Sequence, residues 1–171
     1  MTQQTKQLKT EHKELRNFLE KITIDAGIGR LSQTPNFEEK ALAQVMSDLA
    51  LMTGQKPQLR RAKKSIAGFK IREGQVVGAR VTLRRDRMVD FFERLVKIVL
   101  PRVRDFQGIA RSAVDAGGTL NVGIREQLVF PEINPEQSAI SFPLGVNVVP
   151  KVKSREKAME EYKKLGVPMK K

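Results

Sequence analysis

The sequence from Val76 to Val99 reads VVGARVTLRRDRMVDFFERLVKIV, and it joins a strand pattern to a helix pattern. In its first part apolar residues occupy every second position, which predicts a half-buried strand over 76–84. Apolar residues then recur every three or four positions, and this spacing predicts a helix that Asp86 caps and that continues to Val99. A strand followed by an amphipathic helix supplies the two layers, sheet and helix, from which the rest of the fold is built.

The flanking sequence contains further strand and helix patterns. Strands are expected at 20–27, 58–64, 122–129 and 145–149. Helices are expected at 37–53 and 154–165, with a short arm or helix at 1–18. This order of elements predicts an α+β fold, in which a mostly antiparallel sheet has helices packed on one face and carries a long basic glycine-rich loop. No repeat or linker divides the chain, so residues 1–171 are expected to form a single domain.

The composition is that of a folded, strongly basic protein without cysteine. The 171 residues include 32 Lys and Arg against 19 Asp and Glu, for a formal net charge of +13. The lack of Cys excludes disulfides and thiolate metal sites and fits a reducing compartment. No apolar run approaches the roughly 18–20 residues of a membrane span, and the N-terminus lacks the apolar core of a signal peptide. A cytoplasmic protein with no membrane partner is therefore expected.

A basic run without acidic residues follows the helix predicted at 37–53. Between Asp48 and Glu73 the sequence has seven cations and no carboxylate. The cations are Lys56, Arg60, Arg61, Lys63, Lys64, Lys70 and Arg72. They repel one another unless an external anion compensates, and a nucleic acid does so because its condensed counterions are released on binding. The alternative is a solvated charged face, but the charge excess of the whole chain favours a nucleic-acid partner.

The basic run ends in a glycine-rich loop that is expected to project from the sheet as an arm. The loop contains Gly68, Gly74 and Gly78, and glycines shape loops because they adopt unusual backbone angles. Phe69 lies between Gly68 and Lys70. Its ring either stacks on a base or sugar or folds back and pins the loop, and the sequence favours neither alternative.

No motif in the sequence indicates catalysis or a bound cofactor. The segment Gly27-Ile28-Gly29 lacks the third glycine of a dinucleotide fingerprint, and we interpret it as a tight turn that lets the backbone approach a partner. His12 is the only histidine and has no second ligand beside it in the sequence, so an exposed side chain is expected. We therefore expect neither an enzyme nor a protein that holds a metal or cofactor.

Short motifs spread over nearly the whole chain from about Leu19 carry a family resemblance. They are Glu20-Lys21-Ile22, Gly27-Ile28-Gly29, Thr53-Gly54-Gln55-Lys56-Pro57, AKKSIAGFKIR at 62–72, VTLR at 81–84, FFERL at 91–95, LPRVRDF at 100–106, GIREQ at 123–127 and FPEI at 130–133. In this order and at this spacing they are specific. The chain resembles the bacterial form of the large-subunit ribosomal protein that binds 5S ribosomal RNA, the ribosomal protein L-five family.

The resemblance implies a structural ribosomal protein that binds 5S and large-subunit ribosomal RNA in the central protuberance. Residues expected to bind ribosomal RNA are Lys21, Asp25, Gly27, Gln55, Lys56, Arg60, Lys63, Lys64 and Thr82. The basic loop at 67–78 is expected to reach transfer RNA in the peptidyl site, and the same region to meet a protein of the small-subunit head. Loop residues expected to contact transfer RNA are Gly68, Phe69, Lys70, Arg72, Gly74 and Gly78. The alternative is a free basic RNA-binding or RNA-chaperone protein that acts outside the ribosome.

The sequence departs from the family pattern at three places. Asp25 stands where the family usually has Asn, and an ionised carboxylate accepts hydrogen bonds but repels phosphate. Asp25 therefore either faces RNA or pairs with Lys21 or another basic residue of the sheet. The segment before Glu20 is shorter than usual, so an RNA contact by a full leading helix is expected to be missing. Gln75-Val76 replaces a commoner Tyr-Pro pair, which predicts a less rigid loop tip.

Overall fold

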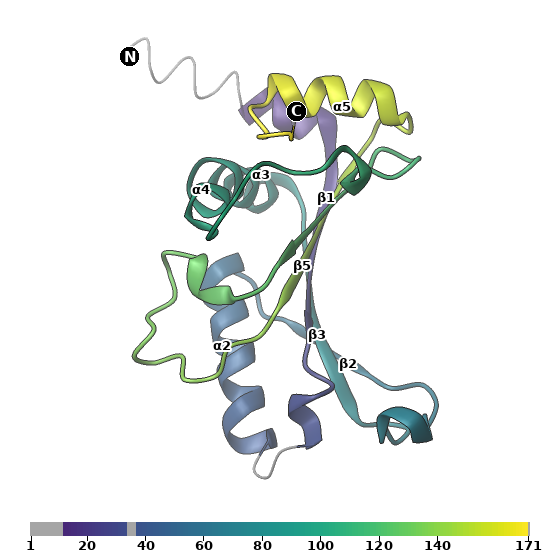
Figure 1. Cartoon of the computed structure of the whole chain (residues 1–171), viewed down its shortest axis with the longest axis vertical. Coiled ribbons are helices and arrows are strands. Elements are labelled where there is room, and N and C mark those ends of the chain that lie inside the picture. Colours follow the sequence, from purple (N-terminus) through teal and green to yellow (C-terminus); the bar gives the residue numbers. More distant parts are fainter. Residues whose placement is uncertain (1–11, 34–36, 171) are drawn as a thin grey trace. The chain divides into compact units, whose positions relative to one another are not determined.

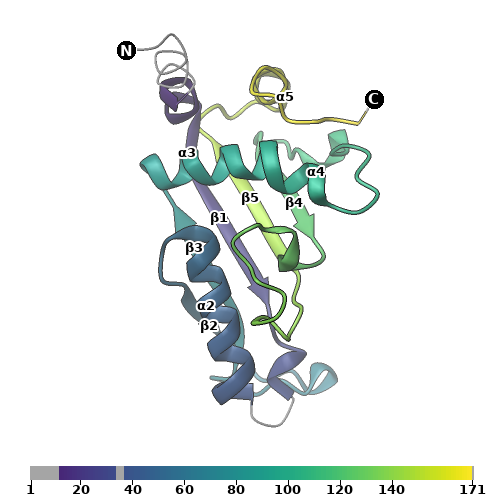
Figure 2. The same ribbon diagram turned by 90° about the vertical axis from the view of Figure 1, so that its left-hand side faces the viewer.

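Five strands form the sheet of the computed structural model, which describes residues 12–33 and 37–170 (Figure 1). The strands are β1 (Leu19–Gly27), β2 (Gln58–Arg61), β3 (Val76–Leu83), β4 (Leu120–Ile124) and β5 (Leu144–Pro150). They are hydrogen-bonded in the order β2-β3-β1-β5-β4, and neighbouring strands run antiparallel (Figure 2). The antiparallel sheet expected from the sequence is confirmed.

Three longer helices accompany the sheet. They are α2 (Leu42–Thr53), α3 (Arg85–Arg94) and α5 (Arg155–Lys164). A π-helical turn at Phe37–Ala41 leads into α2, and another at Leu95–Val99 joins α3 to the short α4 (Leu100–Arg102). Single 3-10 turns lie at Leu31–Gln33, Ala67–Phe69, Arg111–Ala113 and Gln127–Val129. The α+β class is confirmed. Of the arm or helix expected at 1–18, residues 12–18 are helical and residues 1–11 lie outside the described residues.

The apolar stripe predicted after β3 is buried in α3 and in the π turn that follows it. Each of its side chains is at most 2% exposed, namely Met88, Phe91, Phe92, Leu95 and Val99. The cap predicted at Asp86 is wrong. The first helical residue is Arg85, and Arg84 occupies the N-cap position without a side-chain hydrogen bond. Asp86 instead pairs with Arg16 at 3.1 Å.

Two predicted strands end earlier than their sequence patterns suggest. β2 stops at Arg61, after a shift in its pairing register with β3 between Arg60 and Arg61. The strand predicted at 122–129 is β4 followed by a 3-10 turn at Gln127–Val129. Gln127 is fully buried, and its side-chain amide donates to Ile140 O at 2.7 Å. The alternating pattern predicted a strand through Gln127, but this residue is buried in a turn and bonds to the backbone.

The chain folds as two compact units whose segments interleave along the sequence. Unit 1 comprises Met1–Thr23, Thr82–Val122 and Val146–Lys171, and unit 2 comprises Ile24–Val81 and Gly123–Gly145. β1, β3, β4 and β5 each pass from one unit into the other. The single domain expected from the sequence stays a prediction.

Tyr162 of α5 is the largest fully buried side chain of unit 1. Its ring meets Phe18 edge to face, with 5.2 Å between the ring centroids. Its hydroxyl lies 3.1 Å from both Gly118 O and Val148 O and donates its single proton to one of them at a time. Burial raises the pKa of this hydroxyl above its ordinary value of 10.0. Tyr162 therefore joins α5 to the N-terminal helix, to β5 and to the loop before β4.

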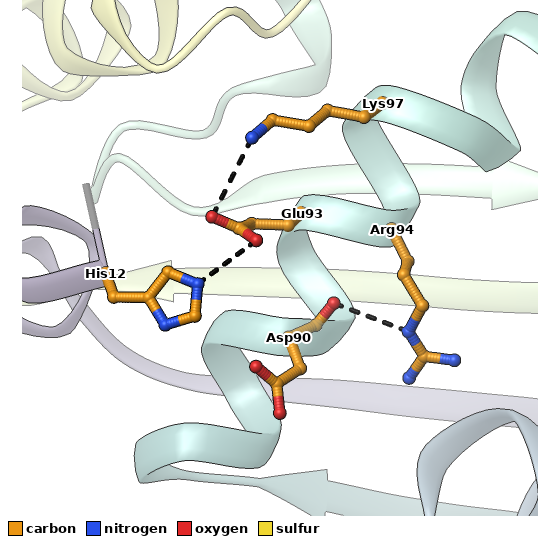
Figure 3. A network of polar contacts seen from close by, with 5 residues as sticks. All are labelled: His12, Asp90, Glu93, Arg94 and Lys97. Carbon is orange, nitrogen blue, oxygen red and sulfur yellow. Dashed lines mark hydrogen bonds and ion pairs between the residues drawn. The ribbon is translucent and has the colours of Figure 1, made fainter. Parts of the chain in front are cut away.

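The N-terminal helical segment is also joined to α3 by a polar network (Figure 3). His12 Nε2 lies 3.2 Å from Glu93 Oε2, and Lys97 Nζ lies 3.8 Å from the other carboxylate oxygen. The His12 side chain is 44% exposed, as a solvent-facing histidine should be, and it also has an acidic partner 81 positions away. Its role in the described residues is to fasten this segment to the core.

Candidate nucleic-acid interface

Side chains alternate in direction along β1 and β3, so each strand has an apolar face and a polar face. In β1, Ile22 and Ile24 are buried, whereas Lys21 and Asp25 are half-exposed on the opposite face. In β3, alternate residues from Ala79 to Leu83 are buried and Arg80 and Thr82 are half-exposed. Helices cover the apolar face in each unit (Figure 2). The sheet residues predicted to bind RNA therefore lie on its uncovered face.

Asp25 forms an ion pair on this uncovered face with Arg80. The two side chains are 30% and 41% exposed, so the pair lies at the surface of the sheet. Lys21, the other candidate partner, lies 3.8 Å from the carboxylate of Glu20. Of the two alternatives for Asp25, the structure therefore has the carboxylate paired with a basic residue of the neighbouring strand.

β2 adds further polar side chains to the same face. Its Cα partners in β3 are Arg80 for Gln58 and Gly78 for Arg60, and directly paired residues of antiparallel strands point to the same side. Arg60 is exposed. Arg61 pairs with Val76 after a shift in register, and its guanidinium donates to Gly74 O at 2.9 Å. Arg60 is thus available to a phosphate, whereas Arg61 stabilises the hairpin that follows.

The remaining predicted cations lie beside β2. Lys56, Lys63 and Lys64 are exposed, and none has an acidic partner within the described ranges. Gln55 is positioned by the end of α2, where its backbone N–H donates to Thr53 Oγ1 at 3.3 Å. Positive charge without a carboxylate partner therefore surrounds this short strand.

The glycine-rich loop forms a small hairpin closed by backbone bonds between Ile66 and Ile71. The N–H of Ile66 donates to Ile71 O at 2.9 Å, and the reverse bond is 3.2 Å. Phe69 at the tip is 69% exposed, so its ring does not fold back into the core. The tip residue with a positive φ is Lys70, at 52°. A charged side chain, and not a glycine, therefore occupies the left-handed position.

The loop glycines were expected to adopt unusual backbone angles, and one of the three does so. Gly74 has a φ of +82°. Gly68 does not adopt a positive φ, and a Cβ added there would meet no other atom within 4 Å. Gly78 belongs to β3, where an added Cβ would lie 3.0 Å from Ala26 O. Gly78 is thus required by the close approach of β1 and β3, and not by the shape of the loop.

Gln75 fastens the hairpin to the turn that follows β1. Its side-chain amide donates to Ser32 Oγ at 2.8 Å, and the hydroxyl of Ser32 donates to Gly29 O at 2.7 Å. The carbonyl oxygen of the same Gln75 side chain accepts from the backbone N–H of Arg72 at 2.9 Å. Gln75 thus cross-links two segments at the base of the hairpin, and the less rigid loop tip expected from the sequence stays a prediction.

A cleft of about 720 Å³ in unit 2 brings several of the predicted residues together. It is lined by Gly27, Gly29, Arg30, Leu31, Gly68, Phe69, Lys70, Ile71, Ser141 and Pro143. Sequence reasoning placed Gly27 with ribosomal RNA and the loop tip with transfer RNA, but it missed that both line one cavity. It also missed Arg30, whose only signal is its place directly after the Gly27-Ile28-Gly29 turn.

The described residues contain no group of three or more His, Cys, Asp or Glu side chains arranged to hold a metal ion. None of their helices is both long enough and apolar enough to cross a membrane.

Comparison with known proteins gives two family matches that together span most of the chain. The family described as "Ribosomal protein L5" matches residues 16–72, and the family that describes the C-terminus of ribosomal L5 proteins matches residues 76–169. Similar proteins are the "Large ribosomal subunit protein uL5" of Fusobacterium nucleatum, 46% identical over 90% of this chain and 81% of the relative, and that of Rubrobacter xylanophilus, 48% identical over 88% and 81%. The protein of the same name in Chlorobaculum tepidum is 44% identical over 90% and 81%.

These relatives agree with the resemblance carried by the sequence motifs. Proteins of this kind are structural components of the bacterial cytoplasmic ribosome and not enzymes, as expected from the sequence. The two strands that carry the polar face, β1 and β3, both lie within the matched residues. The chain therefore belongs to the ribosomal L5 family and is a constituent of the large ribosomal subunit.

Proposed function

We propose that the chain binds 5S ribosomal RNA and large-subunit ribosomal RNA in the central protuberance of the ribosome. The contacts are made by the uncovered face of the sheet and by the exposed cations around β2. The observation that carries this proposal is the acid-free run, because its exposed lysines have no acidic partner within the described ranges. A surface of this kind binds a nucleic acid because its Lys and Arg side chains release the counterions condensed on the phosphates.

Binding to 5S ribosomal RNA is tested against an unrelated structured RNA of the same length at physiological salt. We expect the 5S complex to be tighter, with an affinity that falls by a log–log slope of about 0.7–0.9 per phosphate contacted as salt rises. Equal affinity for the two RNAs would favour the alternative, a free basic RNA-binding or RNA-chaperone protein. Cosedimentation with large subunits through high salt separates the same two functions, because a free RNA binder is washed off.

The hairpin at the tip of the basic run is assigned to transfer RNA in the peptidyl site and to the small-subunit head. Phe69 is 69% exposed, and Lys70 and Arg72 are exposed beside it. None of the three contributes to the buried core of unit 2. The hairpin is thus suited to contact a partner beyond the 5S interface.

Replacing Phe69, Lys70 and Arg72 together by Ala is expected to leave the melting temperature and 5S affinity nearly unchanged. Substitutions of exposed residues usually alter stability by no more than about 0.5 kcal/mol. The same variant should weaken the hold of the ribosome on transfer RNA in the peptidyl site, which a dissociation-rate measurement on reconstituted ribosomes reports. A stability loss of several kcal/mol would show that Phe69 packs in the core, and the assignment of the hairpin as an arm would fail.

Asp25→Asn is expected to leave 5S affinity unchanged or to lower it by no more than about fivefold, the equivalent of about one hydrogen bond. The carboxylate holds the guanidinium of Arg80 in place, and its removal frees that guanidinium to move. Arg80→Gln, which removes the cation and keeps Asp25, should weaken binding more. Binding isotherms of the two variants decide the point, since a clear tightening by Asp25→Asn would mean that the carboxylate faces RNA.

A further inference from the structure

The 720 Å³ cleft of unit 2 lies between the hairpin and the turn after β1, and its lining indicates which part of an RNA it would hold. Its volume falls within the range of about 300–1,000 Å³ that is usual for small-ligand sites. One wall is the turn after β1, from Gly27 to Leu31, and the other is the tip of the hairpin, from Gly68 to Ile71. Ser141 and Pro143 complete the lining. Three separate segments therefore converge on one cavity.

The lining groups match the parts of a single nucleotide. Phe69 supplies an exposed aromatic ring on which a base stacks, and stacking tolerates any base because every base has a π-face. Arg30 and Lys70 supply two exposed cations for a phosphate. The glycines of both walls let a backbone come close, and no lining residue is acidic. An apolar peptide would leave both cations unpaired, so the charges favour a nucleotide.

The two walls are held at a fixed separation by side chains outside the cleft. Gln75 joins the base of the hairpin to Ser32, and Ser32 joins the turn after β1 through Gly29 O. The N–H of Ile28 also donates to Val77 O at 3.1 Å. Preorganisation of this kind favours binding because less conformational freedom is lost when the ligand enters.

We propose that this cleft receives one unstacked nucleotide of an RNA strand, with its base on Phe69 and its phosphate between Arg30 and Lys70. Gln75 and Ser32 act as positioning residues that keep the cleft open. This inference rests on the proposed function, because it names the nucleotide contact that the hairpin and the turn make. The nucleotide belongs either to ribosomal RNA or to transfer RNA, and the chemistry of recognition is the same for both.

The test is a fluorescence-anisotropy titration of the full chain with a labelled single-stranded RNA pentanucleotide of adenosines. Phe69→Ala is expected to lower the affinity about tenfold, as for the loss of one stacked base, whereas Phe69→Tyr keeps the ring and the affinity. Arg30→Ala and Lys70→Asn should each lower the salt slope by about 0.7. Asn is chosen at position 70 because it tolerates the positive φ.

Lys157→Ala is the matched control, because Lys157 is an exposed cation outside the basic run that does not line the cleft. Equal effects of Lys157→Ala, Arg30→Ala and Lys70→Asn, with none from Phe69→Ala, would show unspecific attraction and overturn the proposal. Gln75→Leu and Ser32→Ala should each lower the affinity about threefold and together by less than the product of the two effects, since they share one hydrogen bond and each makes a second. No effect from either would remove Gln75 and Ser32 from the proposal.

Two further measurements identify the source of the nucleotide and separate this inference from the proposed function. A preformed complex with 5S ribosomal RNA that no longer binds the pentanucleotide would assign the nucleotide to 5S RNA. A complex that still binds it, in competition with transfer RNA, would assign the nucleotide to transfer RNA. If the chain binds 5S ribosomal RNA but not the pentanucleotide, the cleft proposal fails alone. If it binds the pentanucleotide but not 5S, the proposed function fails.

Discussion

A variant with four cations of the basic run replaced by Ala is expected to bind 5S ribosomal RNA about 10²–10³-fold more weakly at physiological salt. The four residues are Lys56, Arg60, Lys63 and Lys64. Each phosphate contact contributes about 0.7–0.9 to the salt slope, so four contacts account for a slope of about 3 and for this loss in affinity. Filter binding over a range of salt concentrations measures the affinity and the slope together. All four side chains are exposed, so the fold should be retained.

The matched control removes the same charge from the region of α5. Lys153, Lys157, Lys163 and Lys164 are exposed lysines outside the basic run. Their replacement by Ala lowers the net charge equally, and we expect only a small loss of affinity, because none of these lysines belongs to the acid-free run proposed to contact phosphates. If both variants lose the same affinity, total charge and not the placement of charge determines binding, and the assignment of the interface to the residues around β2 would be wrong.

Tyr162→Ala is expected to lower the free energy of unfolding by about 3–5 kcal/mol, as for other large aromatic side chains removed from a core. The variant loses the edge-to-face contact with Phe18 and leaves Gly118 O and Val148 O without their donor. Tyr162→Phe keeps the ring and should cost only about 1 kcal/mol. Urea denaturation of the two variants measures the difference. Similar losses in both would mean that the hydroxyl, and not the ring, carries the stability.

The same hydroxyl makes stability depend on alkaline pH. Its pKa is raised in the folded state by burial, so the folded chain holds this proton where the unfolded chain releases it. The contribution is fully present below pH 10, the ordinary pKa of the group, and it is lost as pH rises through the raised folded value. Tyr162→Phe should therefore show a weaker fall in unfolding free energy above pH 10 than the unaltered chain.

Local patterns predicted the sheet and helices well where one face of an element is uniformly apolar. β3 and α3 lie close to their expected positions because alternate residues of one and a helical stripe of the other are buried. Prediction was poorest where a polar side chain is buried by long-range hydrogen bonds. Gln127 ends the strand pattern early because it bonds to Ile140 O and Phe142 N, and nothing in the residues around it indicates those partners.

The candidate site was predicted to the extent that charge and family motifs identify it. The exposed lysines follow from their lack of acidic neighbours in the sequence, whereas the pairing of Asp25 with Arg80 stayed one of two alternatives. The partners Ser32 and Gln75 are 43 positions apart, and they meet only because the turn after β1 lies beside the hairpin. Side chains that meet across strands depend on register, which a single sequence does not define.

The order of strands in the sheet also sets when the chain can fold during its synthesis. β1 lies between β3 and β5, so the strand made first stays unpaired along one edge until Leu144–Pro150 has been translated. At about 5–20 residues per second, that wait lasts roughly 6–24 s. An open strand edge is a template for pairing with other chains, and here it is the edge of β1 that later pairs with β5. Nascent chains that meet before β5 emerges are therefore expected to pair along the open edge of β1.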